Sequence, residues 1–362
     1  MQIWIVWLPN VWKSTLFNAL TKTQNAEAAN YPFCTIDPNV WIVTVPDHRM
    51  NEIIKVVSPE KAIPTAIEFV DIAWLVEWAS KWEWLWNKFL SHIRECDAIW
   101  QVVRIFENSN ITHVNNKIDP KADIEIIETE LIMADLQTVE KVKERLKKET
   151  KSWKKDAIAK FELVERLEKH LLEWKRAMKM EMDEEQIEDL KDLHLLTMKP
   201  LLYIANVLEE DVQTFDFEKV KKDLGLDADD IIVPISAKLE EDLIEMSDDE
   251  AKEFLEEMWL EAWWKENLIR AAYKTLWLET FFTAWVKEVR AWTMKKWSTA
   301  PQAAWRIHTD FEKWFICADV VFRKDLVECG WETWAKAKWL LNMQGKDYLM
   351  RDGDVCHFKF SR

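Results

Sequence analysis

The stretch Trp7–Thr15 has the sequence Trp-Leu-Pro-Asn-Val-Trp-Lys-Ser-Thr. The apolar run Met1–Val6 before it predicts a buried strand, and Leu16–Leu20 after it has a helical pattern. A phosphate-binding loop has the frame Gly-x-x-x-x-Gly-Lys-Ser/Thr between a strand and a helix. The stretch keeps the spacing, the lysine and the hydroxyl, but tryptophan occupies both glycine positions. It therefore predicts a phosphate loop in which the two glycines are replaced.

In such a loop each residue has an expected role. The Lys13 ammonium would reach the β- and γ-phosphates, and the Ser14 hydroxyl would bind Mg²⁺. Backbone amides at the start of the helix would surround the phosphate oxygens. The residues expected at the phosphates are Asn10, Val11, Trp12, Lys13, Ser14 and Thr15. Because Lys-Ser-Thr also simply opens many helices, this prediction depends on further motifs.

Two later segments supply oxygen ligands for a metal ion. Asp71 follows the strand predicted at Thr65–Val70 and opens an Asp-x-x-Gly pattern in which Trp74 takes the glycine position. A carboxylate there would hold Mg²⁺, directly or through water. Thr35, in the segment Pro32–Ile36, would add a hydroxyl that closes on the metal ion. The predicted metal ligands are therefore Ser14, Thr35 and Asp71.

Two more motifs follow strands where the base of a nucleotide would bind. Asn206–Glu209 stands where a GTPase carries Asn-Lys-x-Asp, and Ser236–Lys238 stands where the base-contacting Ser-Ala-Lys loop belongs. The chain alternates strands with helical segments, which predicts a parallel α/β sheet. The predicted strands are Met1–Val6, Thr65–Val70, Ile99–Ile105, Leu201–Ala205 and Ile231–Pro234. Five motif elements in the expected order indicate a nucleotide-binding domain far more strongly than any one of them.

Taken together, these motifs make the chain resemble the YchF / Obg-like ATPase family, a branch of the P-loop NTPases. The carriers of the resemblance include Asn30–Ile36, Phe69–Ala73, Ile204–Val207, Val286–Thr293, Thr299–Ala304 and Lys346–Tyr348. The resemblance implies a P-loop NTPase domain in two parts (1–123 and 198–277), a helical coiled-coil insertion (124–197) and a C-terminal TGS domain (278–362). It also implies an ATP- and Mg²⁺-dependent switch in the cytoplasm that contacts the ribosome.

Individual residues indicate which base the nucleotide carries and which residue orients the water for hydrolysis. Val207 replaces the lysine and Glu209 the aspartate of a guanine site, which disfavours guanine; a GTPase with a degenerate motif is the alternative. The nucleotide would also contact Asn206, Ser236 and Ala237. The glutamine that orients water in many GTPases is replaced by Leu75. The resemblance offers His113 as a catalytic residue beside Lys13, although a loop histidine without a role fits its spacing equally well.

Two regions outside the nucleotide motifs have their own character. Apolar residues recur at helical spacing from Ile124 to Leu196, which predicts two long helices folded back on each other. Their middle, Lys141–Lys160, holds nine basic and three acidic residues and is either a solvated tip or an RNA contact. The TGS domain is a second possible RNA contact. The C-terminal region predicts strands at Phe281–Val289 and Trp314–Val320 and a hairpin over Tyr348–Phe360.

The composition has one abnormal feature. The chain has 4 glycines and 24 tryptophans in 362 residues, whereas glycine usually makes up about 7% of a protein. Tryptophans fall at glycine positions of the family pattern at Trp7, Trp12, Trp74, Trp78, Trp82, Trp84, Trp86, Trp285, Trp297, Trp305 and Trp314. We hypothesise that tryptophan has replaced most glycines of a family member. An indole at position 12 would occupy space that the phosphates need, so weak nucleotide binding is expected of the chain as written. An ATP-sensing, ribosome- or RNA-binding module without significant turnover is the other alternative.

Charge and hydropathy limit the remaining classes. The net charge of −16 disfavours a general nucleic-acid coat. No apolar run reaches the length of a membrane span, so we expect no membrane partner. The five cysteines are scattered and odd in number, which favours a reducing, cytoplasmic location.

Overall fold

The computed structural model describes residues 2–7, 40–71, 93–106, 119–149, 155–247, 250, 253–254, 264–329 and 342–361. Its contacts separate two units. The first takes in residues 2–7, residues 40–41 and the described residues from 68 to 254, and the second takes in residues 42–67 and the described residues from 264 to 361. No helix among the described residues is long and apolar enough to cross a membrane. The two units are described separately, beginning with the first.

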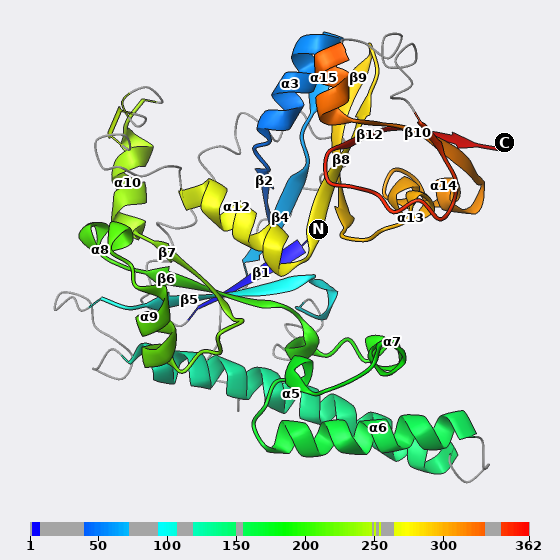
Figure 1. The fold of residues 1–362 in the computed structure, drawn as a ribbon. Coiled ribbons are helices and arrows are strands. Elements are labelled where there is room, and N and C mark those ends of the chain that lie inside the picture. Colours follow the sequence, from blue (N-terminus) through cyan, green and yellow to red (C-terminus); the bar gives the residue numbers. More distant parts are fainter. Residues whose placement is uncertain are drawn as a thin grey trace. The chain divides into compact units, whose positions relative to one another are not determined.

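A six-stranded sheet organises the first unit (Figure 1). In spatial order its strands are β2 (Val40–Thr44), β4 (Ala66–Asp71), β1 (Gln2–Trp7), β5 (Ala98–Arg104), β6 (Leu201–Asn206) and β7 (Ile231–Ile235). From β4 to β7 every neighbouring pair is parallel. The predicted parallel α/β sheet is therefore confirmed, and all five predicted strands lie in it. Buried parallel strands have few polar residues, which is why the sequence predicted them well.

Helices follow the sheet strands in the first unit. They are α5 (Pro120–Glu149), α6 (Lys155–Leu172), α7 (Glu184–Lys191), α8 (Glu209–Gln213), α9 (Phe217–Leu224) and α10 (Ala237–Glu245), with short 3-10 turns η4 (Ala177–Lys179) and η5 (Leu196–Met198). Helix α9 begins at the N-cap Asp216 and ends at Gly225, whose φ of 74° suits glycine. Apolar residues of the first half of α5, among them Ile127 and Leu131, pack against β1, β5 and β6.

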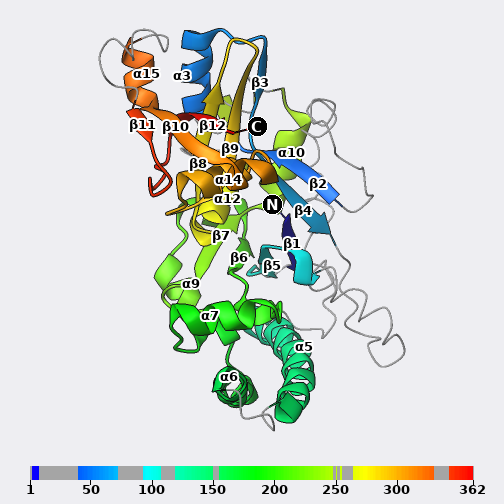
Figure 2. The ribbon, with the colours of Figure 1, turned by 90° about the vertical axis from the view of Figure 1, so that its right-hand side faces the viewer.

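The second half of α5 pairs with α6, and the two helices lie side by side in Figure 2. Their shared core, which includes Val139, Leu146 and Val164, is closed by residues of α7 and the segment after it. The buried Asp135 carboxylate of α5 accepts hydrogen bonds from the amides of Leu196 and Thr197, both 2.8 Å away. The predicted helical hairpin is confirmed, and Asp135 holds the returning chain against it.

A second six-stranded sheet organises the second unit. Its spatial order is β11 (Asn342–Gln344), β10 (Phe315–Phe322), β12 (Asp354–Phe360), β8 (Leu278–Ala284), β9 (Glu288–Lys295) and β3 (Lys61–Ile63). The helices of this unit are α3 (His48–Val57), α12 (Trp264–Thr275), α13 (Ala300–Trp305), α14 (Thr309–Lys313) and α15 (Arg323–Cys329). A capping box between Thr299 and Gln302 begins α13. The expected small, β-rich C-terminal region is confirmed.

Residues 42–67 complete this unit from far away in the sequence. Strand β3 pairs in parallel with β9, matching Ala62 to Val289. Helix α3 lies beside α15 in Figures 1 and 2, and its apolar face packs on the sheet. That face consists of Met50, Ile53 and Val57. A segment from the first fifth of the chain thus supplies both a strand and a helix to the C-terminal fold.

Two expectations for the C-terminal region are wrong. Phe281–Val289 is not one strand, because β8 ends at Ala284 and β9 begins at Glu288, and the two are antiparallel. Tyr348–Phe360 is not a hairpin: only β12 is a strand, and it pairs with β10 and β8. The turn around Gly353 was identified correctly, with a φ of 93°. Its strand partners are distant in sequence, which a local pattern does not reveal.

Three tryptophans have a backbone conformation that favours glycine. Their φ values are 57° at Trp174, 52° at Trp277 and 62° at Trp297. A left-handed conformation costs an L-residue roughly 1–2 kcal/mol, and bulky residues rarely adopt it. All three side chains are more than half exposed. These backbone positions would suit glycine, and the replacement of glycine by tryptophan stays a hypothesis at all of them.

Candidate nucleotide site

The candidate site lies along one edge of the parallel sheet. Because β4, β1, β5, β6 and β7 run in the same direction, the chain leaves all of them at the same edge. Asp71 is paired with Ile5, two residues before β1 ends at Trp7. Neighbouring strands lie about 4.8 Å apart. The backbone at the predicted metal ligand Asp71 is therefore next to the strand from which the predicted phosphate loop departs.

Two strands bring the predicted base-binding residues together. Asn206 ends β6 and is paired with Ile235, which ends β7. The backbone amide of Ala237 donates a hydrogen bond to Asn206 Oδ1 at 3.1 Å. Ser236 is the N-cap of α10, and its Oγ accepts from the Leu239 amide at 3.3 Å. The motifs Asn206–Glu209 and Ser236–Lys238, which are 30 residues apart in sequence, thus meet at one point.

One polar atom at this point has no partner within the described part of the protein. Asn206 is 2% exposed, and its Nδ2 donor makes no hydrogen bond there. An unpaired buried donor costs about 1–3 kcal/mol, so such groups usually bind water or a ligand. A purine ring offers the acceptor N7, which both adenine and guanine carry. Asn206 therefore fits a nucleotide base but does not choose between the two purines.

The next residues differ from a guanine site. Val207 is 5% exposed and packs in the core with Tyr203 and Ala205. Unlike the lysine of a guanine site, its side chain carries no charge. Its amide donates to the carbonyl of Ile235 at 2.8 Å. Glu209 begins α8 and is partly exposed. A carboxylate at this position can accept a hydrogen bond from an exocyclic amino group of either purine.

Sequence reasoning missed one charged residue at this edge. Arg104 ends β5, is paired with Asn206 and has no exposed surface. Its Nε donates to the carbonyl of Phe106 at 3.2 Å. Burial lowers the pKa of this guanidinium, and the charge of Asp123 opposes the change. The available signal was an arginine at the end of a mostly apolar strand.

The remaining predicted site residues lie outside the described residues. They are Asn10, Val11, Trp12, Lys13, Ser14, Thr15, Thr35 and His113. Asp71 is described only through its backbone. Within the described residues no group of three or more His, Cys, Asp or Glu side chains could hold a metal ion. The roles assigned to these residues therefore stay predictions.

A parallel sheet with the predicted base motifs at its carboxyl edge is the architecture of an α/β nucleotide-binding protein. Two family models match the chain: "50S ribosome-binding GTPase" over residues 2–133, and the YchF C-terminal model, described as "Protein of unknown function (DUF933)", over residues 278–361. The chain is similar over its whole length to proteins named ribosome-binding ATPase YchF. The identity is 48% for the protein of Bacillus subtilis and 46% for that of Escherichia coli O157:H7, with 99% of this chain and 98% of each relative covered. The chain belongs to the YchF family.

Solved structures agree with this assignment. The structure described as the Schizosaccharomyces pombe YchF GTPase is 33% identical, has a TM-score of 0.85, and covers 99% of this chain and 97% of its own. A GTP-binding protein of Pyrococcus horikoshii OT3, 19% identical with a TM-score of 0.59, is similar in fold alone. The relatives are thus called ATPase in one comparison and GTPase in others. Their names alone do not decide between adenine and guanine as the bound base.

Proposed function

We propose that the protein is a P-loop ATPase that binds the ribosome and changes state with its bound nucleotide. The observation that carries the proposal is identity of 46–48% over the full length to ribosome-binding ATPases. The geometry supports it through the unpaired Asn206 donor, which lies where the base motifs meet. Fold and base motifs occur together on one sheet edge, as such an activity requires.

The phosphates would be held by the loop that follows β1. In this proposal the Lys13 ammonium contacts the β- and γ-phosphates, and backbone amides of residues 10–15 bind phosphate oxygens. The metal ligands would be the hydroxyls of Ser14 and Thr35 and the carboxylate of Asp71. These are hard oxygen donors of the kind that Mg²⁺ prefers, so the donor set fits the ion. When bound, Mg²⁺ would neutralise charge on the phosphate oxygens.

We assign ATP rather than GTP on the residues that would contact the base. A guanine site pairs an aspartate with the ring N1 and N2 groups and stacks a lysine stem on the ring. Here the buried Val207 has no such stem, and Glu209 is one methylene longer than aspartate. The names of the ATPase relatives agree with this choice. A GTPase is the alternative that a competition experiment addresses.

Hydrolysis needs a water molecule oriented toward the γ-phosphate. Leu75 cannot orient water, because its side chain has no hydrogen-bonding group. We propose that His113 orients the water, as the family resemblance suggests. In a chain with glycine restored at positions 7 and 12, replacing His113 by alanine should lower turnover while leaving ATP affinity unchanged. Unchanged turnover would remove His113 from the proposed machinery.

The central experiment measures ATP and GTP affinity and hydrolysis for the full chain. We expect ATP to bind more tightly than GTP, and Lys13→Ala to abolish binding of both. Binding of ATP that Lys13→Ala leaves intact would overturn the proposed phosphate loop. ATP binding without turnover would favour the ATP-sensing alternative instead. Preferential GTP binding would overturn the base assignment.

A second arm of this experiment tests the tryptophans in the loop. Trp7→Gly with Trp12→Gly should strengthen ATP binding, because glycine permits φ above zero and close backbone approach to phosphate. Equal affinity of the two chains would contradict the replacement hypothesis without affecting the assignment of ATP.

Ribosome binding would use the basic tip of the helical hairpin, Lys141–Lys160, and the C-terminal region. Lys141 and Lys148 are exposed on α5. Replacing both with glutamate should weaken co-sedimentation with ribosomes, and the effect should shrink at high salt because phosphate contacts are screened. A matched control replaces Lys219 and Lys222, exposed on α9, in the same way. Equal loss in both variants would show that net charge, and not the tip, governs binding.

A further inference from the structure

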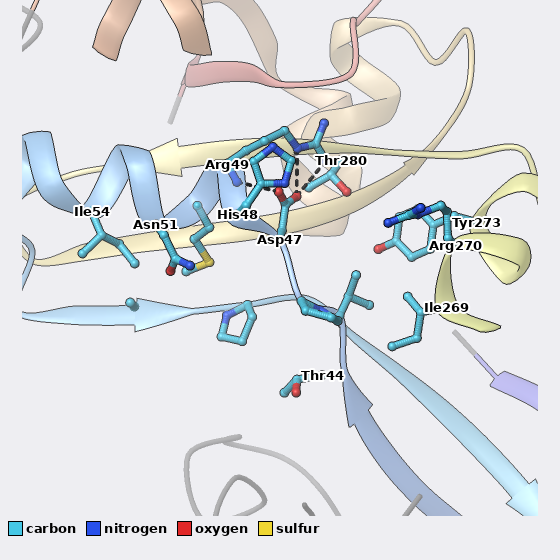
Figure 3. A pocket seen from close by; sticks show the side chains of 15 residues that line it. Thr44, Asp47, His48, Arg49, Asn51, Ile54, Ile269, Arg270, Tyr273 and Thr280 are labelled. Atoms are coloured by element: carbon cyan, nitrogen blue, oxygen red, sulfur yellow. Dashed lines mark hydrogen bonds and ion pairs between the residues drawn. The ribbon is translucent and has the colours of Figure 1, made fainter. Parts of the chain in front are cut away.

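The second unit contains a cavity of about 750 Å³ that shares no residue with the candidate nucleotide site. It lies between the end of β2, the start of α3, β3 with the residues after it, and helix α12 (Figure 3). Every described residue that lines it belongs to this one unit. Small-molecule sites in proteins are typically concave cavities of roughly 300–1,000 Å³. The cavity therefore has the size of a ligand site.

Much of the wall is apolar. Met50 and Ile54 come from α3, Ile269 from α12, and Pro46 and Pro64 from the chain near the two strands. A wall of this kind selects a ligand with an apolar body, because the contact removes apolar surface from water.

The charges at the start of α3 are already matched to one another. Asp47 Oδ2 accepts a hydrogen bond from Arg49 Nη2 at 2.7 Å, and Arg49 Nη1 donates to Asp352 Oδ2 at 2.6 Å. Asp47 Oδ1 also caps the helix through the Arg49 amide at 3.0 Å. Neither the N-terminus of α3 nor the Arg49 guanidinium is therefore open to a charged ligand.

Arg270 differs from this matched group. It projects from α12 toward the start of α3 in Figure 3, it is exposed, and it forms no ion pair with any described residue. Its neighbour Tyr273 is occupied, since the phenol oxygen lies 3.0 Å from Thr293 Oγ1 in a hydrogen bond. Burial raises the pKa of the Tyr273 phenol, so it adds no negative charge. Arg270 thus presents a planar, five-donor cation to a cavity whose wall is apolar over much of its area.

We propose that this cavity binds a small molecule with an apolar ring and one oxyanion, held by Arg270. A carboxylate and a phosphate monoester share this chemistry, because each matches the guanidinium fork with two oxygens. The ring would contact Met50, Ile54 and Ile269. The ligand site would be built largely by residues 44–54, which lie in the sequence between the predicted metal ligands Thr35 and Asp71.

The test titrates the full-length protein with phenyl phosphate and benzoate and follows the methyl NMR signals of Met50, Ile54 and Ile269. Inorganic phosphate and benzyl alcohol supply the anion and the ring separately. We expect saturable shifts with the two ring anions and about tenfold or weaker binding for each separate part. Because the signals are local, binding of phosphate compounds at the nucleotide site does not produce them.

Two variants assign the contacts. Arg270→Gln should weaken phenyl phosphate binding about tenfold or more, since a charge-assisted bidentate contact is lost. Lys274 is exposed, lies one turn of α12 after Arg270 and does not line the cavity. Lys274→Gln therefore removes a nearby charge and should have no effect on binding. Ala62→Phe narrows the cavity from an exposed strand position and should block binding. The absence of saturable shifts would overturn the proposal. Binding that Arg270→Gln and Ala62→Phe leave unchanged would overturn it as well.

Discussion

At the end of β6 the Asn206 side chain uses its oxygen for the Ala237 amide and leaves its nitrogen without a described partner. Asn206→Ala should lower the free energy of unfolding by about 1–3 kcal/mol, because the Ala237 amide loses its acceptor. The variant should also lose ATP affinity. Thermal unfolding with and without saturating ATP separates the two effects, because a ligand that binds only the folded state raises its stability. If ATP raises the melting temperature of the variant and the parent equally, Asn206 does not contact the base.

Trp174 offers a second test at the level of one residue. It follows α6, its amide donates to the Leu171 carbonyl at 2.9 Å, and its φ is 57°. This left-handed position after a helix is the one that glycine most often takes. The indole is 57% exposed, so its removal costs little packing. Trp174→Gly should therefore raise the free energy of unfolding by about 1 kcal/mol in urea denaturation.

Trp305→Gly is the matched control for this prediction. Trp305 is also exposed, but it is the last residue of α13 and has no positive φ. Glycine in a helix should lower stability there, by about 0.5–1 kcal/mol. Stabilisation by both replacements would indicate that loss of an exposed indole, and not backbone strain, is responsible.

Among the elements, the attachment of the helical hairpin to the sheet depends on a buried ion pair. Arg176, which precedes η4, donates from Nη2 to Asp230 Oδ1 at 2.7 Å, just before β7. Both side chains are 8% exposed. Glu128 of α5 lies 3.6 Å from Arg176 Nε and accepts a 2.8 Å hydrogen bond from the Tyr203 hydroxyl. One arginine thus joins the end of the hairpin to α5 and to the loop before β7.

Arg176→Met should lower the free energy of unfolding by about 3 kcal/mol, because it removes the charged partner nearest to the buried Asp230 carboxylate and leaves it the Asp227 amide and the more distant Lys179. Adding Asp230→Leu should restore much of the loss. Lys191→Met, which breaks an exposed pair with Glu188, should change stability by less than about 1 kcal/mol. Similar losses from Arg176→Met and Lys191→Met in urea unfolding would contradict this account.

Local patterns also determined which elements the sequence could predict. The five parallel strands and the helical hairpin were predicted because each carries a long apolar run or a long helical period. Strand β3 is three residues long and pairs with β9, more than 200 residues away, so no local signal marks it. The break between β8 and β9 was missed because Trp285 occupies a turn in which glycine would have signalled a stop.

The candidate site was predictable only where spacing along the chain carries the information. The base motifs at Asn206 and Ser236 were found because each follows a predicted strand, and parallel strands bring such ends together. Arg104 was missed because nothing in the sequence tells whether an arginine after an apolar strand is exposed or buried. Its pairing with Asn206 emerges only from the register of β5 and β6.

At the scale of the whole molecule, the C-terminal unit is made from two distant parts of the chain. The apolar face of α3 is covered by residues of the C-terminal sheet and of α15, namely Phe282, Val289, Val321 and Leu326. A chain that ends at Thr275 would leave that face exposed. We expect it to bind more of the dye 1-anilinonaphthalene-8-sulfonate than the full chain and to aggregate. A truncated chain that stays monomeric with unchanged dye fluorescence would contradict this dependence.

The pairing of β3 with β9 also has a consequence for biosynthesis. Residues 61–63 leave the translating ribosome well before residues 288–290, their partners in the sheet. At about 5–20 residues per second the interval is roughly 11–45 s. During this time α3 and β3 belong to a nascent chain whose partners do not yet exist. Early helix and strand must therefore stay unassociated, or be sheltered by a chaperone, until synthesis is nearly finished.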